Sequence, residues 1–255
     1  MNSIPPIQTT SEVALAKAFI QTTFKDTKHE NVIIAVSGGI DSATSLYLLN
    51  EALDKENIFV VHLYYFEKSV DTFHAVIDPL ELPKENILLY SIKNVVDTIV
   101  QNVSAENDSV RTGNIMARVR MLHLFDLAKK HKALVCGTEN RSEYHLGYFT
   151  RFGDAASDFE LINHLYKTQV RELASYLQVP QSILDAEPSA GLWEGQTDEK
   201  ELGFTYEEAD QILYLHFEEG KTVQEIREQG FEHVDAVMSV VEKNSFKHKV
   251  PYVMG

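Results

Sequence analysis

The chain has 255 residues, of which 44% are hydrophobic and 24% charged, as in a globular protein with enough apolar residues for a core. Its net charge of −15 argues against nonspecific nucleic-acid binding, which needs a basic surface. No apolar run is as long as the roughly 18 residues of a membrane span, the N-terminus lacks signal-peptide features, and the single Cys136 cannot form an internal disulfide. We expect one domain over residues 1–255, in the cytoplasm.

The first elements are a helix and a buried strand. Thr9 with Glu12 is typical of a capping box and predicts a helix that ends near Lys28. The apolar run 32–36 predicts a strand, and the amphipathic stretch 43–53 predicts a helix. A tight turn must join these two elements.

That turn has the sequence Ser37-Gly-Gly-Ile-Asp-Ser42. Gly38 and Gly39 let a ligand approach the main chain closely, and the first amides of the helix form an anion site. Asp41 would repel a bare phosphate, so its presence favours a divalent cation between the carboxylate and the phosphate. The alternative is a plain strand-to-helix turn with Ser42 as its N-cap.

Three further apolar runs, 58–63, 87–90 and 133–136, read as strands, and residues 68–78 as a short helix closed by Pro79. Strands that are apolar on both faces and separated by helices predict an α/β fold with a doubly wound parallel sheet flanked by helices. Ligands bind such sheets beyond the carboxyl ends of the strands. The turn at 37–42 and Thr138 both fall at that edge.

Two later segments are less regular. Residues 109–130 predict a long helix, but Gly113 weakens the pattern and favours a start near Asn114. Residues 185–210 carry nine acids against one lysine. Within them, the glycine-rich segment 186–204 reads either as a mobile lid or as a solvated loop.

The turn resembles the pyrophosphate loop of the N-type ATP pyrophosphatases, whose fold is adenine nucleotide alpha hydrolase-like. Later motifs resemble those of ammonia-dependent NAD synthetases, a family of this fold with C-terminal helices. They are Asn114-Ile-Met-Ala-Arg-Val-Arg120, Gly137-Thr-Glu-Asn-Arg-Ser-Glu143, Gly147-Tyr-Phe-Thr-Arg-Phe-Gly-Asp154, Leu165-Tyr-Lys-Thr-Gln-Val-Arg-Glu-Leu-Ala174 and Pro188-Ser-Ala-Gly-Leu-Trp-Glu-Gly-Gln-Thr-Asp-Glu199.

The resemblance implies a role for each matching residue. ATP would be bound by Ser37, Gly38, Gly39, Asp41, Ser42, Thr138, Lys167 and Ser189. The metal Mg²⁺ would be held by Asp41 and Glu143. Deamido-NAD would be bound by Arg118, Arg151, Asp158, Phe246 and Lys247. The catalytic groups would be Asp41, Lys167 and Asp158.

The implied reaction joins ammonia to the nicotinate carboxylate of deamido-NAD through an adenylated intermediate, releasing pyrophosphate and AMP. Free ammonia is expected because the chain is too short for a second, glutamine-hydrolysing domain. The resemblance also implies a homodimer with the substrate near the interface. The apolar stripe around Val237 could serve that interface or the core.

Some residues depart from the family pattern. This chain has Arg151 where the family usually has a lysine, Ala155 and Ala156 where it has two glycines, and Phe246 where it has a histidine. The resemblance therefore does not determine the shape of the dinucleotide pocket. Two other functions compete. One is a different N-type pyrophosphatase, tRNA-thiolating or GMP-forming, and the other is a nucleotide-binding relative without catalysis.

Overall fold

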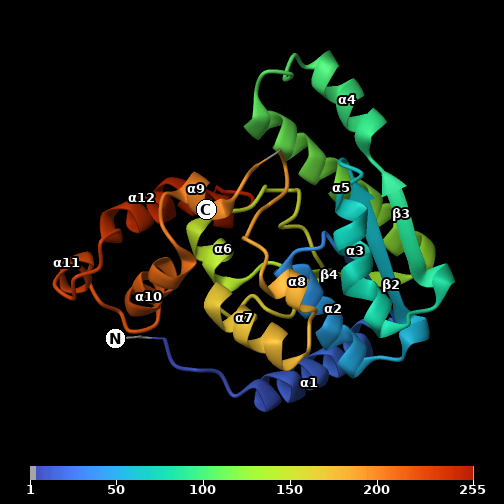
Figure 1. Cartoon of the computed structure of the whole chain (residues 1–255), viewed down its shortest axis with the longest axis horizontal. Helices are drawn as coiled ribbons and strands as arrows, with labels where there is room; N and C mark the ends of the chain where they lie inside the picture. The colour runs from blue at the N-terminus through green and yellow to red at the C-terminus, as the bar shows by residue number, and fades with distance from the viewer. Residues whose placement is uncertain (1–3, 194, 255) are drawn as a thin grey trace.

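The computed structural model describes residues 4–193 and 195–254 (Figure 1). Glu194, inside the predicted lid, lies outside the described residues. The strands are β1 (Asn31–Ala35), β2 (Ile58–Tyr64), β3 (Ile87–Ser91), β4 (Ala133–Gly137) and β5 (Phe159–Glu160). The helices before β4 are α1 (Thr9–Thr27), α2 (Ile40–Ala52), α3 (Ser69–Ile77), α4 (Lys93–Asn102) and α5 (Ser109–His131). Those after it are α6 (Arg141–Leu146), α7 (Lys167–Tyr176), α8 (Gln181–Leu184), α9 (Asp198–Leu202), α10 (Tyr206–Phe217), α11 (Val223–Arg227) and α12 (Val234–Asn244).

The strands form one parallel sheet in the order β3-β2-β1-β4-β5, which confirms the predicted fold class. The chain builds outward from β1 in one direction and then returns to add β4 on its other side. This reversal leaves a crevice beyond the carboxyl ends of β1 and β4, where ligands of such sheets bind.

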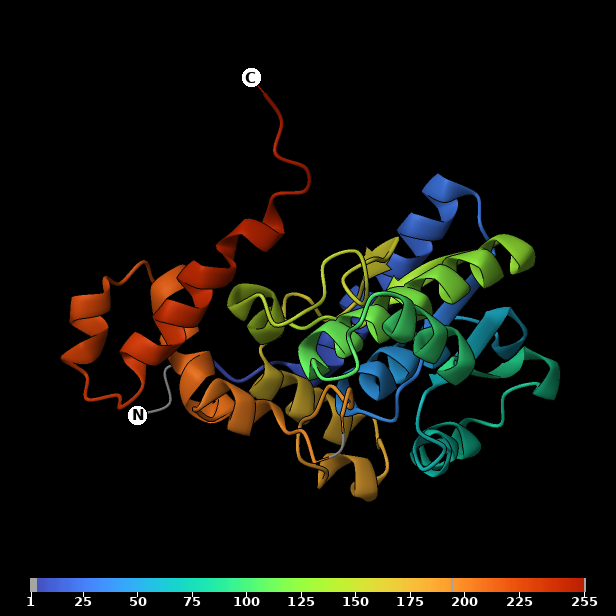
Figure 2. The ribbon, with the colours of Figure 1, turned by 90° about the horizontal axis from the view of Figure 1, so that it is seen from above.

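Alternate residues of β1 face opposite sides of the sheet, so each side has its own core. Val32 and Ile34 pack with α1, α2 and α7, whereas Ile33 packs with α4 and α5. Figure 2 shows the C-terminal helices α10–α12 beside the sheet and the helices that cover it. Within the described residues, no helix has the length and apolar character needed to cross a membrane.

The C-terminal helices have a third core, which includes the stripe on α12. Val234 and Val237 are 2% and 0% exposed, and Met238 and Val241 pack against the same cluster. The stripe therefore serves the core within one chain.

The predicted cap of α1 is wrong, whereas the predicted start of α5 at residue 109 is confirmed over the alternative near Asn114. Thr9 is the first residue of α1, not its cap, and Glu12 contacts His164 Nε2 at 2.9 Å instead of closing a capping box. The helix α5 starts at Ser109, capped by Asp108, and runs through Gly113. A Cβ on Gly113 would lie 2.9 Å from a side-chain carbon of Leu192, so the glycine makes room for that leucine.

Candidate active site

The turn after β1 has the conformation that its glycines allow. Gly38 has φ +93°, and a Cβ there would lie 2.5 Å from Thr72 Oγ1 on α3, so no larger residue fits. The N-cap of α2 is Gly39, so the predicted cap Ser42 is wrong. The Ser42 hydroxyl instead donates a hydrogen bond to Gly39 O at 3.1 Å. Gly39 N donates to Ser37 Oγ at 3.2 Å, so the turn is held by its own hydroxyls.

Asn140 connects the ends of β1 and β4 across the crevice. This fully buried residue caps α6, accepting a hydrogen bond from Glu143 N at 2.9 Å. Its amide also donates to Asp41 Oδ1 at 2.9 Å. One side chain thus fixes Asp41, at the start of α2, relative to the first turn of α6.

Lys167 brings the two predicted metal ligands together. Its Nζ contacts Asp41 Oδ2 at 2.5 Å and Glu143 Oε1 at 3.1 Å, and its side chain is only 3% exposed. Burial lowers the pKa of Lys167, but attraction to Asp41 and Glu143 outweighs it, so the pKa is raised and the lysine is charged. Asp41, Glu143 and Lys167 therefore form one cluster around a buried lysine, the carboxylate–lysine cluster.

Asp210 on α10 supports this cluster from behind. Its two carboxylate oxygens accept hydrogen bonds from Ser142 Oγ at 2.5 Å and from Thr168 N at 2.9 Å. Ser142 Oγ in turn accepts from Lys167 N at 2.8 Å. The starts of α6 and α7 are thus held together.

The cluster suits a hard cation. Asp41 and Glu143 supply carboxylate oxygens from two helix starts, the ligand type that Mg²⁺ takes in nucleotide-binding sites. Burial raises the pKa of Glu143, Lys167 opposes the shift, and a cation would favour the ionised form of the carboxylate. Among the described residues, no three His, Cys, Asp or Glu side chains converge as a metal site, so ATP oxygens and water would complete the coordination of Mg²⁺.

Thr138 lines a small hollow of about 40 Å³ next to the cluster, together with Glu139, Glu143, Phe149, Asp154 and Ala155. Burial and nearby carboxylates raise the pKa of Glu139 to about 9, so this side chain carries a proton at neutral pH. Its Oε1 is buried and has no hydrogen-bond partner in the described part of the chain.

Ser189 lies in the predicted lid, and the lid is anchored in this structure. The Ser189 hydroxyl donates to Gln196 O at 2.8 Å. Asp198 is 2% exposed, and Tyr148 OH donates to Glu201 Oε2 at 2.8 Å and to Asp198 Oδ1 at 3.3 Å. Segment 186–204 therefore contacts the loop after α6.

Four predicted substrate residues gather around that loop. Lys247 Nζ donates to Gly147 O at 2.7 Å and to Phe149 O at 2.9 Å. The Arg151 guanidinium lies 5.3 Å from the ring centroids of Phe152 and Phe246. Arg118 reaches Arg151 O at 3.4 Å.

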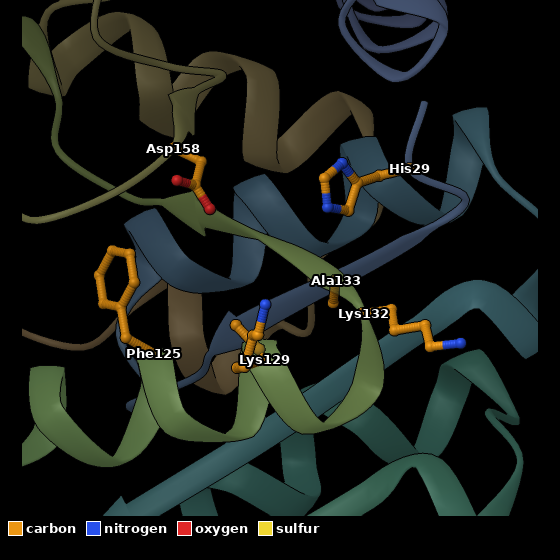
Figure 3. Close-up of a pocket in the computed structure, with 7 residues that line it drawn as sticks. His29, Phe125, Lys129, Lys132, Ala133 and Asp158 are labelled. Atoms are coloured by element: carbon orange, nitrogen blue, oxygen red, sulfur yellow. The ribbon is translucent and has the colours of Figure 1, made fainter. Parts of the chain in front are cut away.

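The structure does not bring Asp158 to the carboxylate–lysine cluster. Its N–H and its Oδ2 both bond to Val135, two residues before the end of β4. With His29, Phe125, Ala128, Lys129, Lys132 and Ala133 it lines a separate hollow of about 260 Å³ (Figure 3).

Sequence reasoning missed Asn140, Asp198, Tyr206 and Asp210. Tyr206 places its ring 5.2 Å from Lys167 Nζ. One signal was present for Asp210, because it is a lone acid on the apolar face of α10, between Ala209 and Leu213. Asn140 lies inside a quoted motif and is a residue type that caps helices.

The chain was compared with known families and proteins. Residues 12–251 match the sequence profile of the family described as NAD synthase. The NH(3)-dependent NAD(+) synthetase of Fusobacterium nucleatum is 41% identical over 92% of both chains. That of Thermococcus sibiricus is 40% identical, again over 92% of both chains.

Two solved structures are similar to this chain over almost its whole length. The NMN synthetase of Francisella tularensis superimposes with a TM-score of 0.83 at 30% identity, covering 98% of this chain and 99% of the other. The NH3-dependent NAD synthetase of Campylobacter jejuni, in complex with the nitrate ion, gives 0.80 at 27%, covering 98% and 100%.

Proposed function

Because the chain belongs to the NAD synthase family, we propose that it makes NAD by amidating deamido-NAD with ammonia and ATP. It is a ligase of NAD biosynthesis that uses ATP. The observation that carries the proposal is the carboxylate–lysine cluster, which lies beside a glycine turn at the crevice between β1 and β4. A catalytically inactive relative would have no need to keep this buried charge.

The first step activates the carboxylate, because an oxygen anion is a poor leaving group. A nicotinate carboxylate oxygen attacks the α-phosphorus of ATP, the bond to the bridging oxygen breaks, and pyrophosphate leaves. The turn 37–42 would hold the phosphates through main-chain amides and the Ser37 and Ser42 hydroxyls. Thr138, Lys167 and Ser189 would complete the ATP site, with Lys167 as its charged donor.

The second step forms the amide. Ammonia attacks the acyl carbon, AMP leaves with the bonding electrons, and the nitrogen loses a proton. Neither step needs a protein nucleophile, so the protein acts by orienting the reactants and excluding water. Segment 186–204 would provide that exclusion as a lid within the single domain.

Mg²⁺ would be held by Asp41 and Glu143 and would supply Lewis-acid stabilisation of the phosphate charge. Both residues occupy the first turn of a helix, and Asn140 fixes their spacing. A divalent cation would also reduce the repulsion between an anionic nucleotide and a protein of net charge −15.

Deamido-NAD would be bound by Arg118, Arg151, Phe246 and Lys247. Asp158 would meet the substrate only if the substrate extends to the second hollow, whose lining includes Lys129 and Lys132. A homodimer with the substrate near its interface, and a cytoplasmic location, remain predictions.

A second candidate is the formation of NMN from its mononucleotide acid. The observation that favours it is the superposition with the Francisella NMN synthetase. Both candidates use the same chemistry and differ only in whether the substrate carries an adenylate half.

One assay tests both candidates. Purified protein is incubated with ATP, Mg²⁺, ammonium and either deamido-NAD or the mononucleotide acid. We expect NAD and AMP in equal amounts and a higher kcat/KM for deamido-NAD. A preference for the mononucleotide would support the second candidate, and no amide from either would reject both.

A further inference from the structure

Arg120 lies at the carboxyl edge of the same sheet and has no role in the reaction described so far. It is on α5, and its Nε donates to Leu63 O at 3.0 Å, next to the carboxyl end of β2. The side chain is partly buried. Among the described residues, this is the only hydrogen bond that the structure gives it, so its two terminal nitrogens lack a partner.

Another arginine of the same helix is better satisfied. Arg111, on the same helix, donates from both terminal nitrogens, to Ser104 O at 3.2 Å and Val103 O at 2.9 Å. A guanidinium carries five N–H donors in a planar fork that suits two oxygens of one anion. The free donors of Arg120 therefore form an unused anion-binding group.

Geometry places the Arg120 charge at the strand end beside the turn 37–42, because Leu63 follows Val61 by two residues and the Val61 carbonyl accepts a hydrogen bond from Val36 N at 2.9 Å. Burial lowers the pKa of Arg120 and the Asp154 carboxylate opposes the shift, but an arginine stays protonated. Asp154 lines the hollow with Thr138 and Glu143, although its Oδ1 is already used by Thr150 N. Desolvating a cation without a bonded anion is unfavourable, so an arriving anion would be attracted.

Lys167 cannot supply this charge alone, because its ammonium is already paired with Asp41 and donates to Glu143. During adenylyl transfer, the phosphorus carries five oxygens and extra negative charge. We propose that Arg120 is a catalytic residue, whose terminal nitrogens donate to the α-phosphoryl oxygens of ATP while the nicotinate carboxylate displaces pyrophosphate. This inference rests on the proposed function and assigns Arg120 to its first step.

The experiment isolates that step. Exchange of labelled pyrophosphate into ATP, dependent on deamido-NAD and without ammonia, reports adenylation and its reversal. The variants are Arg120→Gln and Arg120→Lys, with Arg111→Gln as the control on the same helix. We expect Arg120→Gln to lower the exchange rate on the order of 100-fold, with the KM for ATP changed less than about threefold. Arg120→Lys should recover only part of the rate, because it cannot bind two oxygens at once.

Two further measurements separate catalysis from folding. Circular dichroism checks each variant, and free guanidinium at millimolar concentration should restore exchange in Arg120→Ala while equal sodium chloride should not. If Arg120→Lys is the only variant that folds, its exchange rate alone tests the proposal. Exchange within threefold of wild type in a folded Arg120 variant, or a loss confined to the KM for deamido-NAD, would overturn the proposal. Absence of exchange and of NAD in the wild type would instead reject the proposed function.

Discussion

At the residue scale, the sequence predicts a residue's position in the site well when that residue directly follows a long strand, and poorly when its position depends on contacts with distant segments. Asp41 and Glu143 follow the carboxyl ends of adjacent strands, so a parallel sheet had to bring them together. Asp158 could not be placed, because its location depends on β5, a two-residue strand without its own apolar run. Asn140 was missed because its two hydrogen bonds are visible only in three dimensions.

The metal ligands are tested by isosteric substitution. Asp41→Asn and Glu143→Gln each remove a carboxylate but little packing, so NAD formation should fall by a factor on the order of 10² or more while circular dichroism is unchanged. Glu51→Gln is the control, since Glu51 lies on the same helix as Asp41 and pairs with Lys17 at the surface. A variant that retains a near-native rate with Mg²⁺ would remove that residue from the metal site.

Glu139 gives a pH prediction for stability. Burial raises its pKa from 4.5 to about 9, so the folded chain holds a proton that the unfolded chain has lost at neutral pH. The free energy of unfolding should therefore decrease as pH rises toward 9. Glu139→Gln should weaken this decrease, measured by urea unfolding at pH 6 and pH 9. An identical decrease in the variant would contradict the shift. Some dependence should remain from Glu160, whose pKa burial raises to about 7.

Arg151 tests the dinucleotide site. Its guanidinium stacks on Phe152 and Phe246, and the described residues show no ion pair between it and Asp154, the alternative partner on the surface. Arg151→Ala should raise the KM for deamido-NAD roughly tenfold, the cost of a charged hydrogen bond, and leave the KM for ATP nearly unchanged. If neither constant moves, Lys247 becomes the stronger anchor.

At the element scale, the apolar runs predicted the four longer strands to within one or two residues, because buried parallel strands leave a clear pattern. Gly113 favoured the alternative start of α5 near Asn114, but the helix runs through this glycine. Local helix propensity does not include the packing of Leu192, far along the chain, against Gly113. The same contact shows where segment 186–204 is anchored.

This anchor makes the lid testable. Hydrogen exchange of segment 186–204 should slow when ATP and deamido-NAD bind, because closure must shield the adenylated intermediate from water. Gly113→Ala should displace Leu192, speed exchange in the bound state, and raise the ratio of AMP to NAD above one by hydrolysis. Ala128→Gly on the same helix is a control for helix stability. Equally slow exchange with and without ligands would identify a fixed loop.

At the scale of the whole molecule, the topology, not the composition, locates the reaction. A net charge of −15 excludes little beyond nonspecific nucleic-acid binding, and composition alone does not reveal the substrate. The strand order β3-β2-β1-β4-β5 concentrates the starts of α2, α6 and α7 at one crevice, where the partial positive charge of helix N-termini favours phosphate. The fold thus presents an anion site within an acidic protein.

The central claim is that a nicotinate carboxylate is activated by adenylation at this crevice. Deamido-NAD labelled with ¹⁸O in that carboxylate tests it most directly, with AMP and pyrophosphate analysed by mass spectrometry after amidation. Adenylation predicts one labelled oxygen in each AMP formed with NAD and none in pyrophosphate. Label found in pyrophosphate or in orthophosphate, or AMP without label, would contradict the account.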